Sequence, residues 1–154
     1  MTNETKLQSA YTETLKEKFL TTTGRVNRLT FFKRSIALAA INFIVIFFTV
    51  FLIMLFTMST TPPSWMNFIL IAIMGALLIP QYCLNAKRLH DFGKDATLAK
   101  IFLVINFLTM TYNFNVSVDS EFIILDSAAF IIPWIFSLYL LFKKGDESSN
   151  EYGN

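Results

Sequence analysis

The amino-acid sequence predicts an all-α membrane protein, a four-helix transmembrane bundle preceded by a short amphipathic interfacial helix. Three observations lead to this fold class. Hydrophobic residues make up 54% of the 154 residues and charged residues only 16%, which departs from the balance of soluble domains. The apolar residues gather in long runs between Ser35 and Phe142, as bilayer spans do. Lys and Arg lie outside these runs, except for Lys100.

Residues 1–34 are expected to form a cytoplasmic segment that is amphipathic and basic. Asn27 is placed to cap a helix that starts near Arg28. A partly ordered, solvated tail stays open as the alternative for the first 23 residues. The interpretation as a helix in the headgroup plane rests on apolar side chains that recur every three to four residues among lysines: Leu7, Tyr11, Leu15, Phe19 and Leu20.

Four apolar runs within residues 35–142 are expected to form the transmembrane domain. The first holds about 24 residues, which at about 1.5 Å per residue is long enough to cross with some tilt. The predicted spans and the cytoplasmic tail cover about 35–58, 66–86, 97–114, 122–142 and 143–154.

The third run is the weakest of the four. Lys100 lies inside it, so only about 14 residues that follow are free of charge. If Lys100 extends to the interface, the run can still cross. A re-entrant hairpin is the alternative. The fourth run contains Asp126, an ionisable residue inside a span and therefore a functional candidate, unless it simply reaches water near the far interface.

The 13 Lys and Arg residues all fall on one side of the membrane if the four runs cross it. The two connectors on the far side, residues 59–65 and 113–121, contain none. Because positive charge marks cytoplasmic loops, we expect both termini in the cytoplasm and an even number of crossings. A three-crossing arrangement would export Lys143 and Lys144.

Three polar segments on the expected cytoplasmic side carry a family resemblance. They are Gly-Arg-Val-Asn-Arg at 24–28, Arg-Leu-His-Asp-Phe-Gly-Lys at 88–94, and Asn-x-Tyr-Gly at 150–153. In this order they resemble the small bacterial inner-membrane protein family of the YhaH/YhaI type, domain of unknown function 805. The chain departs from the family pattern at 95–97, where Asp-Ala-Thr replaces the usual Ser-Gly and Trp. The resemblance implies an inner-membrane location and brings no reaction or substrate.

The cations of these segments suggest a polar cluster or a lipid-headgroup site. Arg25 and Arg28 flank a helix start, where free N–H groups and the helix dipole favour an anion. The candidate anions are lipid phosphates and Asp91, and ordinary topology-setting charge is the alternative. The candidate site residues are Arg25, Asn27, Arg28, Arg88, His90, Asp91 and Lys94.

Catalysis is not expected. His90 and Asp91 are sequence neighbours, which do not face each other on a helix, and no nucleophile or second histidine accompanies them. Cys83 is the only cysteine, which excludes an intrachain disulfide and a cysteine metal cluster. We therefore expect no catalytic, cofactor-binding or metal-binding residues.

The functional class that fits best is a non-enzymatic scaffold, interaction or envelope-sensing protein of the bacterial inner membrane. An oligomeric transporter or channel for small solutes or ions is the alternative, and a membrane enzyme ranks third. The expected partners are the lipid bilayer, anionic lipid in particular, and a second copy or another membrane protein. With a net charge of only +2, nucleic acid is not an expected partner.

Overall fold

The structure, a computed structural model, describes residues 14–57, 64–115, 123–146, 148 and 150–152. All regular elements in these residues are helices, so the predicted all-α class is confirmed. They are α2 (Leu15–Phe19), α3 (Arg28–Thr57), α4 (Ser64–His90), α5 (Thr97–Asn115) and α6 (Ile123–Phe142).

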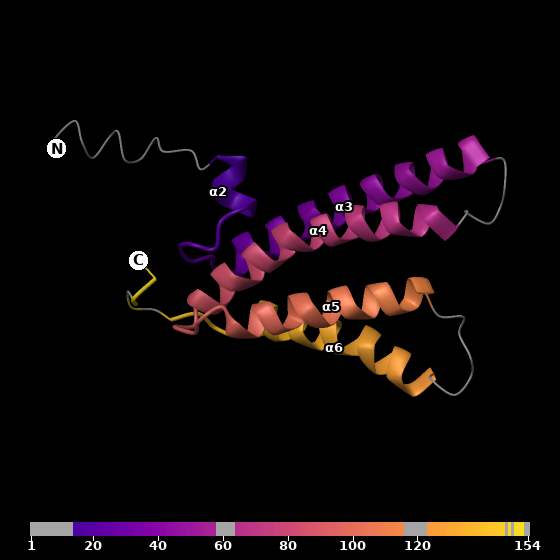
Figure 1. Cartoon of the computed structure of the whole chain (residues 1–154). Coiled ribbons are helices and arrows are strands. Elements are labelled where there is room, and N and C mark those ends of the chain that lie inside the picture. The colour runs from indigo at the N-terminus through magenta and orange to yellow at the C-terminus, as the bar shows by residue number, and fades with distance from the viewer. Residues whose placement is uncertain (1–13, 58–63, 116–122, 147, 149, 153–154) are drawn as a thin grey trace.

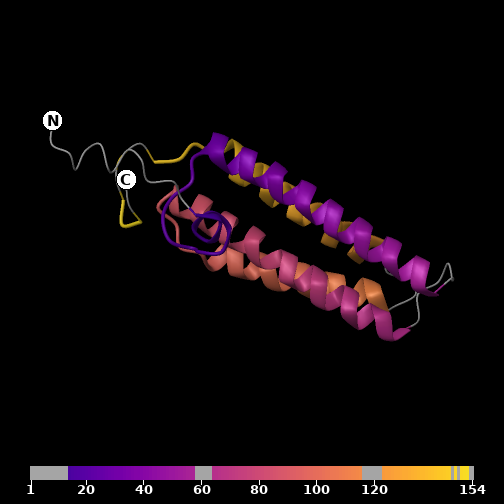
Figure 2. The ribbon, with the colours of Figure 1, turned by 90° about the horizontal axis from the view of Figure 1, so that it is seen from above.

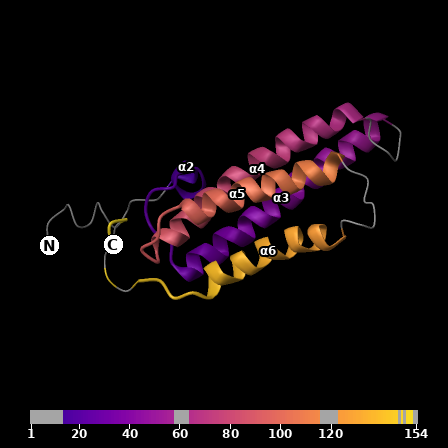
Figure 3. The same ribbon diagram turned by 60° about the horizontal axis from the view of Figure 1, so that its bottom comes forward.

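The four long helices form a bundle in which the chain reverses direction from each helix to the next (Figure 1). Contacts join α3 to α4, α4 to α5, α5 to α6 and α6 back to α3, so the helices form a closed ring. Figures 2 and 3 show the same arrangement from two other sides. One end of the bundle holds α2, the start of α3, the α4–α5 connection and the residues after α6, and we refer to it as the polar end.

Helix α3 begins where its capping residue predicts. The Thr30 N–H donates to Oδ1 of Asn27 at 2.9 Å, which satisfies one of the free donors of the first turn. The helix has 30 residues, because the polar residues before the apolar run form its first two turns. At about 1.5 Å per residue it is about 45 Å long.

Helix α4 ends later than the sequence suggested. The second span was expected to end near residue 86, before the connection to the third span at 97, whereas α4 continues through His90. It ends in a Schellman motif, in which Gly93 N–H donates to His90 O at 3.0 Å and Lys94 N–H to Leu89 O at 3.1 Å. Gly93 has φ +63°, which glycine adopts without steric cost.

Helix α5 is continuous over 19 residues, so no turn of a re-entrant hairpin interrupts it. Lys100 is exposed on its first turns. Before the helix, the Asp95 carboxylate accepts hydrogen bonds from the Thr97 hydroxyl at 2.7 Å and the Thr97 N–H at 3.3 Å. These two bonds lower the pKa of Asp95, since they favour its charged form.

Helix α2 is the described part of the expected amphipathic segment, whose residues 1–13 lie outside the described chain. Thr14 and Glu17 form a capping box at its start. The helix contacts the end of α4, where the Lys87 ammonium donates to the Glu17 carbonyl. Phe19 packs against the main hydrophobic core.

The main core of buried residues lies toward the polar end, and the outer faces of the helices are apolar and exposed. Phe43, Phe56 and Phe68 are among many large hydrophobic side chains on these faces. Two stretches of the described helices are long and apolar enough to cross a membrane by length and composition, Arg28–Phe56 and Met66–His90, and their most apolar windows are only 11% and 17% buried. The core consists of Val26, Phe31, Leu38, Leu84, Ala86, Leu89, Phe92, Ala99, Phe136 and Leu140.

Candidate functional site

Arg88 is the centre of the polar end and is fully buried. Its Nε donates to the Leu140 carbonyl at 2.8 Å, and its Nη2 to the Lys143 carbonyl at 2.5 Å. Both acceptors lie at the C-terminus of α6, where the last helical carbonyls lack intrahelical donors and the dipole favours a cation. Arg88 on α4 therefore caps α6.

The same guanidinium joins two further segments to α6. Its Nη1 donates to the Val26 carbonyl at 3.2 Å and to the Asp91 carboxylate. The guanidinium carbon also lies 4.5 Å from the centre of the Phe92 ring, in reach of a cation–π contact. The Arg88 side chain thus links three parts of the chain: the segment before α3, the end of α4 and the end of α6.

Asp91 pairs with a second arginine that is distant in the sequence. Nε and Nη2 of Arg25 each lie 3.3 Å from Oδ1 of Asp91, and the two side chains are only 9% and 10% exposed. Nη2 and Nη1 of Arg25 donate further to the carbonyls of Asp146, at 2.7 Å, and Ser148, at 2.9 Å. One carboxylate thus faces two guanidinium groups, and carbonyl oxygens compensate the excess positive charge.

The segment after α6 closes over this ion pair. The Asp146 N–H donates to the Asp91 carbonyl at 2.7 Å. Gly145 lies so close to Asp91 that a Cβ at this position would be 2.6 Å from Cγ of the carboxylate. Only a residue without a side chain fits there.

His90 serves in the packing of the C-terminal segment. Its Nδ1 lies 3.2 Å from the Gly24 carbonyl, and its ring stacks on Tyr152 with the ring centres 4.0 Å apart. Asn150 Nδ2 donates to the His90 carbonyl at 2.9 Å. His90 and Asp91 thus have separate partners and do not form a base with its orienting acid. We refer to this set as the polar cluster: Arg25, Arg88, His90, Asp91, Asp146, Asn150 and Tyr152.

The structure divides the candidate residues derived from the sequence into four groups. Four of them lie together in the polar cluster, and Asn27 caps α3. Arg28 and Lys94 are exposed at the polar end. Asp126 lies on the first turn of α6, and its side chain lies outside the described part of the structure.

Sequence reasoning missed the C-terminal half of the cluster. Asp146, Asn150 and Tyr152 were not among the candidate residues, although the terminal Asn-x-Tyr pattern was a visible signal. The carbonyls of Leu140 and Lys143 have no signal in the sequence, because every residue carries a carbonyl. Within the described residues, no group of three or more His, Cys, Asp and Glu side chains is arranged to hold a metal ion.

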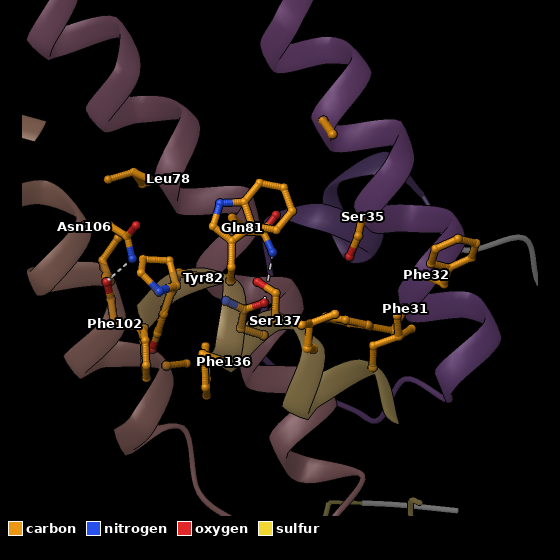
Figure 4. A pocket seen from close by; sticks show the side chains of 18 of the residues that line it. Phe31, Phe32, Ser35, Leu78, Gln81, Tyr82, Phe102, Asn106, Phe136 and Ser137 are labelled. Atoms are coloured by element: carbon orange, nitrogen blue, oxygen red, sulfur yellow. Dashed lines mark hydrogen bonds between the residues drawn. The ribbon is translucent and has the colours of Figure 1, made fainter. Parts of the chain in front are cut away.

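A cavity of about 410 Å³ lies between the four long helices beside the polar cluster. All four helices contribute to its wall, and Figure 4 shows Ser35, Gln81 and Asn106 around it. Gln81 Nε2 donates to Oδ1 of Asn85 at 2.9 Å, and Asn106 Nδ2 to the Phe102 carbonyl at 2.6 Å. The cavity therefore combines an apolar wall with a few amide and hydroxyl groups.

A comparison with protein families finds one match that covers both sites. The family described as "Protein of unknown function (DUF805)" matches residues 19–154, which include the polar cluster and every residue of the cavity wall. No curated protein and no solved structure matches the chain.

Proposed function

The chain belongs to the DUF805 family, whose function is unknown, and from this premise we propose that it is a non-enzymatic scaffold or sensing protein that crosses the bacterial inner membrane four times. One observation carries the proposal. Every Lys and Arg of the described residues lies at the polar end, whereas the outer faces of the helices are apolar and exposed. Exposed apolar surface of this extent requires cover, and lipid supplies it along the whole length of the helices.

The charge distribution sets the orientation. Positive residues are retained in the cytoplasm, so the polar end faces the cytoplasm with both ends of the chain. Helices α5 and α6 contain 19 and 20 residues, which corresponds to about 28–30 Å. That length matches the hydrocarbon core of a bilayer, about 30 Å. Both helices are therefore long enough to cross, and four crossings place the two termini on the same side.

The polar cluster supports a structural role over catalysis. Its two arginines, its histidine and its aspartate are engaged with one another and with backbone carbonyls, and the side chains are buried. A partner could contact the exposed cations around the polar end, which we call its rim. Arg28, Lys33, Lys94 and Lys100 are exposed there, and they form a basic surface suited to anionic headgroups or to an acidic protein surface.

Reporter fusions test the orientation. Alkaline phosphatase, active outside the cytoplasm, and a fluorescent protein, active inside, are inserted in turn within residues 58–63, within residues 116–122 and after Asn154. We expect the first two positions to report the outside and the last to report the inside. A fusion beside Lys94 is the internal control for the cytoplasmic side. The same compartment at 116–122 and at Asn154 would rule out a crossing by α6, and a cytoplasmic report at 116–122 would rule out the third crossing, by α5.

Photocrosslinking tests the interaction role. A photoreactive residue replaces Lys94 or Lys100 at the rim, and Phe43 on an exposed apolar face serves as the matched control. We expect a discrete protein or anionic-lipid adduct from the rim positions and bulk lipid adducts from position 43. The same bulk lipid pattern at all three positions would contradict a specific partner at the polar end.

A further inference from the structure

We propose that the cavity between the four helices binds one uncharged, lipid-soluble molecule whose head is a flat ring bearing carbonyl groups. The molecule enters sideways from the bilayer between α3 and α6. The route of entry rests on the membrane location proposed above. The chemistry of the site follows from its walls.

The walls exclude a charged ligand. None of the residues that line the cavity carries a charge, and an ion without a counter-charge is strongly disfavoured away from water. The phosphate of a phospholipid therefore has no partner inside. The lining residues are Phe31, Phe32, Ser35, Ile36, Ala39, Leu78, Gln81, Tyr82, Asn85, Ala99, Phe102, Leu103, Asn106, Pro133, Trp134, Phe136, Ser137, Leu138 and Leu141.

The walls favour a flat ring. Each of the four helices contributes an aromatic side chain to the lining, with Phe31 on α3, Tyr82 on α4, Phe102 on α5 and Phe136 on α6. Phe102 and Phe136 stack on each other nearly parallel, with ring centres 3.7 Å apart, so each ring keeps one face for a further ring. Aromatic faces pack well against a planar conjugated ligand. The volume of about 410 Å³ falls in the range of small-molecule sites, about 300–1,000 Å³.

The polar groups of the wall suit carbonyl oxygens. Gln81 and Asn85 share a single hydrogen bond, so whichever way the two amides are oriented, one NH₂ group and one carbonyl remain for a ligand. The Ser35 hydroxyl is buried and has no hydrogen-bond partner among the described residues. A ligand carbonyl that accepts from Ser35 or from the remaining NH₂ group satisfies a donor that the protein leaves unmet.

The mouth of the cavity opens to the side of the bundle. Ile36 on α3 is 54% exposed, and Trp134 and Leu138 on α6 are 61% and 49% exposed. The lining residues of α4 and α5 are buried or half-buried. The opening therefore lies between α3 and α6, on a face proposed to contact lipid. A ligand with an apolar tail can leave the tail among the acyl chains while its head sits inside.

Trp134 makes binding measurable, because it lines the cavity and the chain has only one other tryptophan. In a Trp65→Phe variant of the full chain, purified in mild detergent, Trp134 is the single tryptophan, and its fluorescence is excited selectively over that of the five tyrosines. Decylubiquinone, a quinone ring with a short tail, is the probe. We expect saturable quenching at one quinone per chain. Quenching that rises linearly with the quinone content of the micelles would show partitioning alone and would overturn the proposal.

Competition identifies the head group. Dioctanoylglycerol carries ester carbonyls without a ring, and phosphatidylglycerol carries a charge. We expect the first to displace the quinone only at concentrations at least about tenfold higher, and the second not to displace it. Equal displacement by dioctanoylglycerol would overturn the ring assignment in favour of a neutral glycerolipid. Displacement by phosphatidylglycerol at quinone-like concentrations would overturn the exclusion of charge.

Matched variants locate the site. Ala39→Phe narrows the mouth, whereas the neighbouring Ala40 is exposed outside the lining, so Ala40→Phe is the control. We expect about tenfold weaker binding for the first and unchanged binding for the second. Ser35→Ala should weaken binding about threefold without altering the helical circular dichroism. Unchanged binding in both Ala39→Phe and Ser35→Ala would overturn the proposal. The binding assay in detergent does not depend on membrane orientation. If the wild-type chain fails to bind the quinone while the reporter fusions give the expected pattern, the cavity site is rejected and the proposed membrane topology stands.

Discussion

The ring of Tyr152 lies flat on the imidazole of His90, with the ring centres 4.0 Å apart and an angle of 4° between the planes. Asn150 binds the carbonyl of the same histidine. These residues belong to two of the three segments that carry the family resemblance, Arg-Leu-His-Asp and Asn-x-Tyr-Gly. The two motifs thus form one structural unit at the end of the bundle.

Removing the Asn150 side chain should loosen the C-terminal segment. Asn150→Ala loses the hydrogen bond to the His90 carbonyl and the acceptor of the Tyr152 N–H. At about 1 kcal/mol for each hydrogen bond, the segment should open at least about fivefold more often. Limited proteolysis of the purified chain, with mass spectrometry of the tail fragments, measures the change. Ser148→Ala, at an exposed residue whose backbone carbonyl stays in place, is the control and should be cleaved at the wild-type rate. An equal rate for Asn150→Ala would show that the other contacts hold the segment, namely the stacked rings and the hydrogen bonds of Asp146 and Ser148.

Arg88 should not tolerate replacement by lysine. An ammonium group cannot reach the Val26, Leu140 and Lys143 carbonyls together with Asp91, because the guanidinium contacts them in different directions. Loss of one partner from a buried ion pair destabilises a protein by about 3–5 kcal/mol, and Arg88→Lys should approach the lower figure. Denaturant titration in mixed micelles measures it. The exposed Arg28→Lys should stay within about 0.5 kcal/mol, and equal stability of both variants would contradict the assigned role of Arg88.

Gly145→Ala should destabilise the polar cluster. The added methyl group would collide with the Asp91 carboxylate and lie 3.1 Å from the Asp91 carbonyl, so the segment or the ion pair must shift. Overpacking of this kind costs about 1–3 kcal/mol. Ser148→Ala leaves the backbone acceptor of Arg25 in place and is the control in the same titration. Wild-type stability of Gly145→Ala would mean that the segment has free space.

Binding of anionic lipid should depend on the exposed cations at the rim of the polar end and not on Arg25. Arg28 and Lys33 are exposed, and each cation near an anionic surface contributes about 1 kcal/mol. Arg28→Glu with Lys33→Glu should therefore lose bound phosphatidylglycerol in native mass spectrometry, and added salt should weaken wild-type binding. Arg25→Glu should instead destabilise the fold, because it places a carboxylate beside Asp91. Equal retention of anionic and zwitterionic lipid by the wild type would leave these cations as topology markers only.

The helices could be predicted from the sequence because their signal is local. Long apolar runs, the cap at Asn27 and the positions of the cations gave elements that agree with α3 to α6 within a few residues. The end of α4 was missed because its last turn is charged, and charged residues after an apolar run usually mark a loop. Residues 87–91 are buried because of partners that come from elsewhere in the chain.

The site was harder to predict because its contacts are distant in the sequence. Arg25 and Asp91 are 66 residues apart, and Asp91 and lipid phosphate were equally good partners for Arg25 on chemical grounds. Only packing decides between them. The cavity is likewise a property of packing, although Gln81 and Asn85 were visible as polar interruptions near the end of the second run.

The contacts of Arg88 also bear on the order in which the chain is assembled during synthesis. Its acceptor on α6, the Leu140 carbonyl, lies 52 residues further along the chain, which a ribosome reaches roughly 3–10 s later at about 5–20 residues per second. Asp91 is only three residues away and is available almost at once. The short-range pair can therefore neutralise the guanidinium while the later helices are still being made. The bundle can then close around a charge that has had a partner since its own helix formed.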